Sequence, residues 1–304
     1  MQPKTRVALF WPHGVSVDVQ EIKTVPIEVY YFSGTGNCLA VARAITARTG
    51  GTLVAIPEVI GRSEVSTRAD IIGVVFPTHL APLYGIPLIV DSFFRKLERL
   101  ESKYLFAVCT CGGYEIVNAV PALRNLAKLI RSLGSNLSAE YSVRLPMNNL
   151  SYDHIPVPIE KSSEVILRSS KVMISDVCER ISARRRGRHQ LRRALFNFAM
   201  TPMYTMLKKP VLTSLKAMAN VPLDSKLGFR ELMPLTDKSI RVDDNCNGCA
   251  ICTRVCPVHN IQLVDKRPVW QHHCEICFAC DEWCPRKAVH HWSDSVQISS
   301  QFRD

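Results

Sequence analysis

Eight of the chain's twelve cysteines repeat one spacing twice within forty residues. Each copy has three cysteines with two residues between neighbours, then a fourth cysteine after three more residues, followed by proline. Three closely spaced thiolates can bind three corners of a cubic iron–sulfur cluster, while the fourth lies beyond that turn and reaches a second cluster. The predicted ligand sets are Cys246, Cys249, Cys252 and Cys284 for one [4Fe–4S] cluster, and Cys274, Cys277, Cys280 and Cys256 for the other.

Zinc sites and disulfides are the two other uses of such cysteines. Zinc sites usually pair two separated Cys-x2-Cys knuckles, and they need neither a third cysteine at that spacing nor a proline after the last one. Disulfides do not call for an internally repeated, metal-type spacing. The repeat therefore favours two iron–sulfur clusters over both alternatives.

The repeat resembles the two-cluster bacterial ferredoxins over Arg241 to Trp292, roughly the last fifth of the chain. The resemblance implies a small α+β electron-transfer module, with an antiparallel pairing of 259–264 and 267–270 between the two cysteine motifs. His259, His272 and His273 flank the cysteines. Because thiolates already fill all eight ligand positions, we expect these histidines to surround the clusters or to face solvent.

A second set of candidate residues lies near the start of the chain, at Ser33, Gly34, Thr35, Gly36, Asn37 and Cys38. It follows a β-branched and aromatic run at 27–32, which predicts a buried strand, and it opens a helix predicted over 37–49. Glycines let the backbone curl closely, so amide N–H groups, two hydroxyls and the helix dipole can hold a phosphate group. The segment predicts a phosphate-binding loop that needs no basic side chain.

The elements that must position this loop alternate between strand and helix. Strands are predicted over 27–32, 52–56, 70–76, 103–109 and 139–145, and helices over 37–49, 87–100 and 115–133. Such alternation predicts a parallel sheet with helices on both faces. Five strands suit the flavodoxin-like order of a doubly wound α/β fold, in which ligands bind beyond the C-terminal ends of the strands.

The phosphate loop in this setting resembles that of flavodoxins and of flavodoxin–ferredoxin fusion proteins. Their loop reads Ser/Thr-x-Thr-Gly-x-Thr, matched here by Ser33, Thr35 and Gly36, with Cys38 in place of the last threonine. The resemblance implies bound FMN, its ring lying between the loops after the third and fourth strands. By position, the ring contacts would be Thr78, His79 and Tyr84 in one loop, and Thr110, Cys111, Gly112, Gly113 and Tyr114 in the other.

The first of those loops lacks the tryptophan that is usual in flavodoxins. Together with Cys38, this departure leaves a second interpretation open, in which the loops are tight turns of a domain that binds no flavin. The predicted parts of the chain are an extension at 1–25, the flavodoxin-like domain at 26–150, a basic helical connector at 151–239 and the ferredoxin domain at 240–304.

The connector carries most of the positive charge. The chain's net charge is +11, and residues 160–216 alone have an excess of nine positive charges. Helices are predicted over 160–186 and 191–219, the second interrupted by Pro202 and Pro210, and a linker over 221–239. A connector with a solvated basic face is favoured over docking of 184–216 on an anionic membrane or an acidic protein. No recognition motif supports nucleic-acid binding.

The amino-acid composition indicates the cellular location in which this chemistry would take place. Cys38, Cys109, Cys111 and Cys178 remain as unpaired thiols, which together with oxygen-sensitive clusters predicts a reducing, cytoplasmic location. No apolar run is long enough for a signal peptide or for a membrane-spanning helix. The sequence predicts a soluble protein.

Together these features predict an electron carrier that couples FMN to two clusters and exchanges electrons with redox partner proteins. No triad or pair of carboxylates demands a catalytic side chain. Two alternatives stay open: a flavin-dependent reductase of a small-molecule electron acceptor fed by the clusters, and a ferredoxin whose flavodoxin-like part is an empty docking domain.

Overall fold

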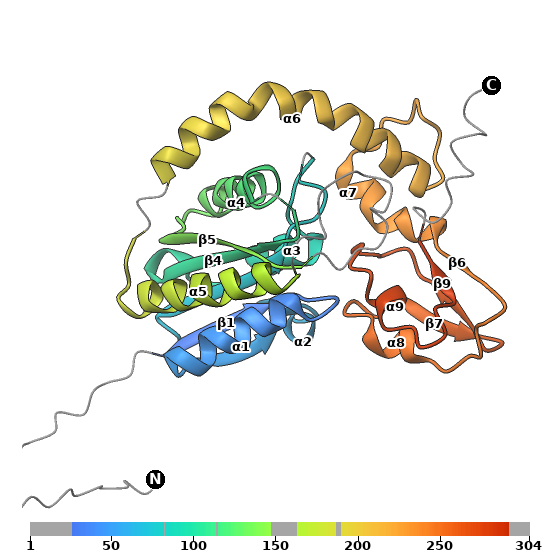
Figure 1. Cartoon of the computed structure of the whole chain (residues 1–304), viewed down its shortest axis with the longest axis horizontal. Coiled ribbons are helices and arrows are strands. Elements are labelled where there is room, and N and C mark those ends of the chain that lie inside the picture. The colour runs from blue at the N-terminus through green and yellow to red at the C-terminus, as the bar shows by residue number, and fades with distance from the viewer. Residues whose placement is uncertain (1–25, 82, 114, 147–162, 187–189, 292–304) are drawn as a thin grey trace, which may run out of the picture.

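The computed structural model describes residues 26–81, 83–113, 115–146, 163–186 and 190–291, as a larger α/β domain and a smaller cysteine-rich domain (Figure 1). The predicted extension at 1–25 lies outside these residues. Within the described ranges, no helix is both long enough and apolar enough to cross a membrane.

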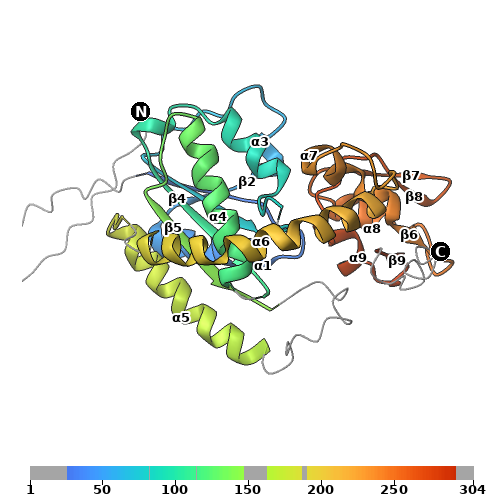
Figure 2. The same ribbon diagram turned by 90° about the horizontal axis from the view of Figure 1, so that it is seen from above.

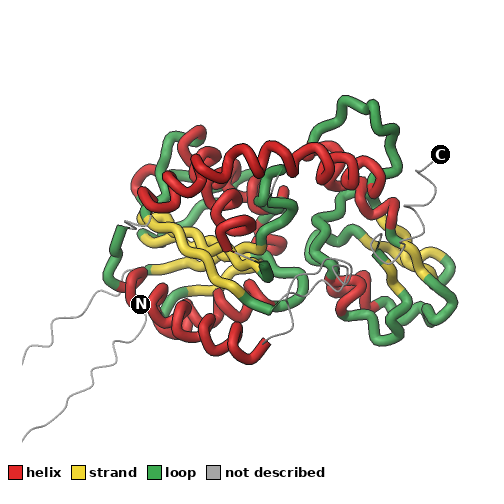
Figure 3. Tube along the Cα trace, turned by 45° about the horizontal axis from the view of Figure 1, so that its top comes forward, coloured by secondary structure: helices red, strands yellow, loops and turns green. Residues whose placement is uncertain are grey.

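The larger domain is built on a five-stranded parallel sheet of order β2-β1-β3-β4-β5. In Figure 3 the strands of the larger domain lie between helices. Its strands are β1 (Ile27–Tyr31), β2 (Thr52–Ala55), β3 (Ile71–Pro77), β4 (Tyr104–Cys111) and β5 (Ala139–Arg144). The central strands β3 and β4 are buried on both faces, as continuous apolar runs in a parallel sheet require. This is the flavodoxin-like order, and the predicted doubly wound fold is confirmed.

Helices cover both faces of the sheet. One face carries α2 (Ile56–Val59), α3 (Leu88–Lys96) and α4 (Glu115–Ser132), and a 3-10 turn, η1 (Leu100–Ser102), precedes β4. The other carries α1 (Asn37–Thr49) and α5 (Ser163–Ser182), so α4 and α5 lie on opposite sides of the sheet in Figure 1. The sequence placed α5 in the connector, but Val177 and Ile181 pack it on α1 and β5. It belongs to the larger domain.

A long helix, α6 (Gln190–Met218), runs along both domains (Figures 1 and 2). The predicted interruption at Pro202 and Pro210 is wrong, because both prolines lie inside this one helix. A proline removes one hydrogen bond and clashes with the preceding turn, which bends a helix and need not end it. Figure 1 shows α6 arched over α4 toward the smaller domain.

The smaller domain begins earlier than the sequence indicates. The predicted linker at 221–239 contains α7 (Phe229–Leu232) and η3 (Met233–Ser239), with Leu232 and Met233 fully buried. The remaining elements are β6 (Arg241–Val242), α8 (Ile251–Val255), β7 (Ile261–Val264), β8 (Arg267–Trp270), α9 (Ala279–Glu282) and β9 (Val289–His290). The predicted antiparallel pairing between the cysteine motifs is confirmed as β7–β8, and β6 pairs with β9.

Candidate cluster and cofactor site

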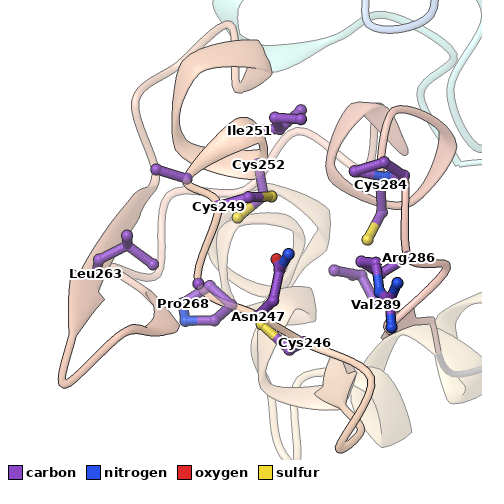
Figure 4. Close-up of a pocket in the computed structure, with 13 residues that line it drawn as sticks. Cys246, Asn247, Cys249, Ile251, Cys252, Leu263, Pro268, Cys284, Arg286 and Val289 are labelled. Atoms are coloured by element: carbon purple, nitrogen blue, oxygen red, sulfur yellow. The ribbon is translucent and has the colours of Figure 1, made fainter.

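One pocket of the smaller domain gathers four cysteines from distant parts of the cysteine-rich stretch. Three come from the first copy of the repeat and one from the second: Cys246, Cys249, Cys252 and Cys284 (Figure 4). Leu263, Pro268 and Val289 line the pocket with apolar surface. The fold thus brings together the crossed set that the spacing predicts for one cluster, and their binding of iron stays a prediction.

The two copies of the repeat share one backbone geometry. In each copy, both neighbours of the second cysteine have positive φ: 73° and 60° at Gly248 and Ala250, and 47° and 58° at Ile276 and Phe278. A short helix begins directly afterwards and carries the third cysteine, α8 in one copy and α9 in the other. A β-branched residue rarely has positive φ and keeps it only where its surroundings impose it. The Ile276 backbone therefore marks a constrained loop.

The other four cysteines lie together at the junction of the two domains. They are Cys256, Cys274, Cys277 and Cys280. Burial raises the pKa of the Cys274, Cys277 and Cys280 thiols, and the neighbouring cysteines of the group raise it further. Backbone N–H groups point at two of the sulfur atoms. The amide of Asn260 donates to Cys256 Sγ at 3.2 Å, and that of Ile276 donates to Cys274 Sγ at 3.3 Å. Such donors stabilise thiolate ligands and tune the potential of a bound cluster.

Neither group of cysteines is arranged around a single ion. Among the residues that the structure describes, no three His, Cys, Asp or Glu side chains come close enough to hold one metal ion. Zinc draws its four ligand atoms to about 2.0–2.3 Å from one centre.

Two histidines contact this region in ways that the sequence did not reveal. The Nε2 atom of buried His291 lies 3.7 Å from Cys280 Sγ, and its ring packs on Phe278 with 4.6 Å between centroids. Burial lowers the pKa of His291 to about 4, so its ring is neutral near pH 7. His272 bonds the carboxylate of Asp237, with 2.7 Å between Nδ1 and Oδ1.

Asp237 and Asn260 form a buried polar link between η3 and the cysteine motifs. The Asn260 side-chain amide donates to Asp237 at 2.8 Å, and its carbonyl oxygen accepts the backbone N–H of His273 at 2.8 Å. A buried polar group that is fully hydrogen-bonded fixes its neighbours in place. His259 and His273 themselves are exposed.

The predicted phosphate loop lies between β1 and α1, at the edge where the parallel strands end. Gly36 has a φ of 107°, and its N–H donates to Ser33 Oγ at 3.1 Å. The first amides of α1 have no acceptor within the helix, so they and the dipole can bind an anion. Cys38 turns inward, with Sγ 3.0 Å from the Thr110 hydroxyl, and burial raises its pKa to about 12. The Cys38 thiol therefore adds no hydrogen-bond donor to the phosphate loop.

His79, in the loop after β3, also lies at this edge. Its ring meets that of Phe32 edge-on, with 6.1 Å between centroids, and burial lowers its pKa to about 4. Its Nδ1 atom is buried and has no hydrogen-bond partner among the described residues. Buried polar atoms are nearly always paired, so this nitrogen suits a polar group of a ligand. Thr78 next to it donates its backbone N–H to the Thr110 carbonyl at 2.9 Å.

The predicted ring contacts in the loop after β4 stay predictions. Burial raises the pKa of Cys111 to about 12, so this thiol is not reactive. Gly112 and Gly113 are half-buried, and Tyr114 lies outside the described residues. The Asn37 side chain donates to the Pro146 carbonyl at 3.1 Å, which ties the phosphate loop to the end of β5.

Tyr84 points to the smaller domain. Its hydroxyl bonds the Asp91 carboxylate and accepts from Arg230 Nη2 at 3.1 Å, while its ring packs near Phe229. Asp91 is 1% exposed and also bonds Arg230 and Arg95, at 2.6 and 2.7 Å. Burial would raise the pKa of Asp91, but the hydrogen bonds from Arg230, Tyr84 and Arg95 outweigh it and lower the pKa. A flavin contact by Tyr84 stays a prediction.

The second copy of the cysteine repeat packs directly on the phosphate loop. A Cβ atom added to Gly34 would overlap the carbonyl oxygen of Cys277 and lie 2.7 Å from its Cβ. The buried Glu275 carboxylate accepts the backbone N–H groups of Leu88, at 2.9 Å, and Ile89, at 2.7 Å. Burial raises the pKa of Glu275 to about 7, although these hydrogen bonds oppose the shift. One cysteine group and the phosphate loop therefore share a junction.

An apolar cluster surrounds this junction. It joins the end of α6, the α7–η3 segment, the loop before α3 and the second cysteine motif. Its buried residues are Leu215, Ala219, Leu232, Met233 and Ile276, and Leu80, Leu83, Leu88 and Phe278 pack against them. Burying this surface holds the domains together through the hydrophobic effect.

Comparisons with known proteins concern the larger domain. No protein-family model and no curated protein matches the chain. Solved structures similar to part of it include a Streptococcus pneumoniae flavodoxin (14% identity, 52% of this chain and 98% of that one, TM-score 0.33). Others are the two-electron reduced Megasphaera elsdenii flavodoxin (20%, 40% and 90%, 0.30) and a Bacillus anthracis FMN-dependent NADH-azoreductase in complex with FMN (10%, 52% and 99%, 0.34).

The residues that join the two domains were missed by sequence reasoning. Glu275 directly follows a cysteine in the sequence, which does not indicate a role in joining the domains. That role is visible only in its hydrogen bond with the backbone of Leu88, 187 positions away. Arg230 lay in a presumed linker, and His291 follows the last motif by seven residues. The one available signal was the glycine at 34, whose lack of a side chain permits the close approach of Cys277.

Proposed function

We propose that this protein is an electron-transfer iron–sulfur flavoprotein, which couples FMN to two [4Fe–4S] clusters within one chain. The observation that supports it best is the contact of Cys277 with Gly34, because the two belong to the predicted inner cluster ligands and the predicted phosphate loop. A carrier needs its redox groups close together and needs no nucleophile or general base.

The cysteines fit the clusters. Each predicted set supplies four thiols, one of them from the other copy of the repeat, as the crossed pattern of two-cluster ferredoxins demands. Backbone amides already donate to the sulfurs of Cys256, Cys274 and Cys284. None of the twelve cysteines, all of which the structure describes, forms a disulfide, which suits the reducing cytoplasm that we propose as the location.

The phosphate loop fits FMN in part. Gly36 and the α1 N-terminus provide the anion site, and the unpaired Nδ1 of His79 offers a polar contact. Bound FMN would supply two-electron chemistry, while each cluster takes one electron at a time. The protein's own part is to orient these groups, to exclude water at the domain junction and to present hydrogen bonds that set their potentials.

Anaerobic purification followed by metal analysis and absorbance tests the proposal. We expect about eight iron atoms and one FMN per chain, since two [4Fe–4S] clusters need that iron content. Zinc in place of iron would overturn the cluster assignment.

A second candidate is a ferredoxin whose larger domain docks without a flavin. The inward turn of Cys38, whose thiol contacts the Thr110 hydroxyl, favours it. It predicts full iron content and no FMN even after FMN is added. The same purification therefore separates the two functions.

A further inference from the structure

The two groups of cysteines have different surroundings, and this inference rests on the proposed function. We infer that the group at Cys256, Cys274, Cys277 and Cys280 is an inner redox centre held against the flavin site, and that the group at Cys246, Cys249, Cys252 and Cys284 is an outer centre that exchanges electrons with an external protein. Gly34 and Glu275 are positioning residues for the inner centre.

The inner centre is defined by contact with the larger domain. The Cys277 backbone lies against Gly34, and Cys277 also packs on the apolar core of the larger domain. Cys256 and Cys280 are each only 8% exposed. On this side the phosphate loop and the loop before α3 pack against the second cysteine motif, while Cys274 and Cys277 are half-buried.

The outer centre is open to solvent. Cys249 is exposed, while Cys246, Cys252 and Cys284 are half-buried. Its pocket is lined entirely by residues of the smaller domain between 246 and 289. No residue of the larger domain is among them, so the outer centre lies away from the predicted flavin site.

Glu275 fixes the distance between the inner centre and the flavin site. Its carboxylate bonds two amides at the start of α3, where the helix dipole favours negative charge. Because Glu275 follows Cys274 directly, any movement of the cysteine loop breaks these hydrogen bonds. The neighbouring Ile276 adds an apolar contact to Leu80, Leu83 and Leu88 in the same cluster.

Each transfer moves one electron and forms no bond. Cys246, Cys249, Cys252 and Cys284 would hold the outer cluster, which would supply one-electron exchange with an external donor or acceptor protein. Cys256, Cys274, Cys277 and Cys280 would hold the inner cluster beside the flavin site, so that the electron lost by an external donor would be gained within the chain.

Gly34→Ala tests the positioning, with Gly61→Ala as the matched control. Both glycines lack positive φ, but a Cβ on Gly61 meets nothing within 4 Å. In the full anaerobic chain, Gly34→Ala should keep its iron and slow electron transfer between clusters and flavin by about tenfold or more, since displacements near 1 Å have large effects on rate. Gly61→Ala should match the parent protein.

Iron loss to a chelator gives a readout that does not depend on the flavin. We expect two phases of about four iron atoms each, the fast one from the outer centre. Cys249→Ser should remove the fast phase, and Gly34→Ala should speed only the slow one. If Gly34→Ala does not fold, Glu275→Gln replaces it with the same expectations.

Two results would overturn this inference: a single phase of iron loss, or unchanged transfer and unchanged iron loss in both Gly34→Ala and Glu275→Gln. A protein that holds iron but no FMN would instead contradict the proposed function, and its iron-loss phases would still decide between inner and outer centres.

Discussion

Asp91 and Asp176 make the same ion pair in two environments. Each carboxylate lies 2.7 Å from the Nε atom of an arginine four residues later, but Asp91 is 1% exposed and Asp176 is 55% exposed. Buried charges that lose their hydrogen bonds cost far more than exposed ones. Asp91 also holds Arg230, so its pair belongs to the domain junction.

We therefore expect Asp91→Asn to lower the free energy of unfolding by about 2 kcal/mol, because the hydrogen bonds from two guanidinium groups lose their charged acceptor. Asp176→Asn should change it by less than about 0.5 kcal/mol. Urea unfolding of the two anaerobic variants measures both values. Equal losses would show that burial does not distinguish the pairs.

His79 should make stability depend on pH. Its pKa is lowered to about 4 in the folded protein by burial, and the unfolded chain has an ordinary histidine pKa near 6.5. Between these values the unfolded state binds more protons, so stability is present at neutral pH and is lost as the pH falls toward 4. The loss from this one group reaches about 2 kcal/mol at pH 5.

The comparison of His79→Gln with the parent protein isolates this effect. Glu275, with its pKa raised to about 7, acts in the opposite sense, since its contribution is lost as the pH rises. That contribution is common to both proteins and cancels in their difference. The difference in free energy of unfolding between the parent protein and His79→Gln should change by about 2 kcal/mol between pH 7 and pH 5. If it does not change, the pKa of His79 is not lowered in the folded protein.

At the scale of helices and strands, the sequence was sufficient to predict an element where the contacts that stabilise it join residues close in the chain. Helix α1 was predicted over the range observed, because Gly36 and Gly50 take left-handed conformations at its two ends. The β7–β8 pairing was implied by the resemblance of the cysteine repeat to two-cluster ferredoxins, and its strands are close in the chain. In contrast, α7 and η3 were expected to be a linker, since Leu232 and Met233 are buried only against distant residues.

The same reason explains what was missed at the site. The crossed cysteine set was predictable from spacing, because the repeat is local. The Glu275 contact with α3 and the docking of Cys277 on Gly34 join residues far apart in the chain, and no sequence period marks them. The hydrogen bonds of Tyr84 to Asp91 and Arg230 likewise have no marker in the sequence, and the flavin contact of Tyr84 stays a prediction.

The shared backbone of the two cysteine motifs gives a prediction for these loops. Gly248 has a φ of 73°, and a Cβ there would lie 2.8 Å from the Lys266 carbonyl oxygen. Gly248→Ala should therefore distort the outer loop and reduce the iron content of the reconstituted protein to about four atoms per chain. Ala250→Gly is the control, because its φ of 60° favours glycine. Full iron content in Gly248→Ala would contradict a requirement for this turn.

At the scale of the whole molecule, cluster binding and domain docking should be coupled. The loop 274–280 carries three of the four inner cysteines and also makes the contacts with Gly34, Leu88 and Ile89. Its positive φ values at Ile276 and Phe278 cost free energy that the surrounding contacts must offset. Removal of the cluster takes away three of those constraints, so the loop should relax and leave α3.

Hydrogen exchange in iron-loaded and iron-stripped protein measures this coupling. The amides of Leu88 and Ile89 should lose protection when iron is removed, because the Glu275 carboxylate is their acceptor. The amide of Val108, fully buried in the central strand β4, should keep its protection in both forms. Unchanged protection at Leu88 and Ile89 would mean that the domains dock without help from the cluster. Loss at all three amides would mean that the iron stabilises the entire fold, in which case the junction is not a separate unit.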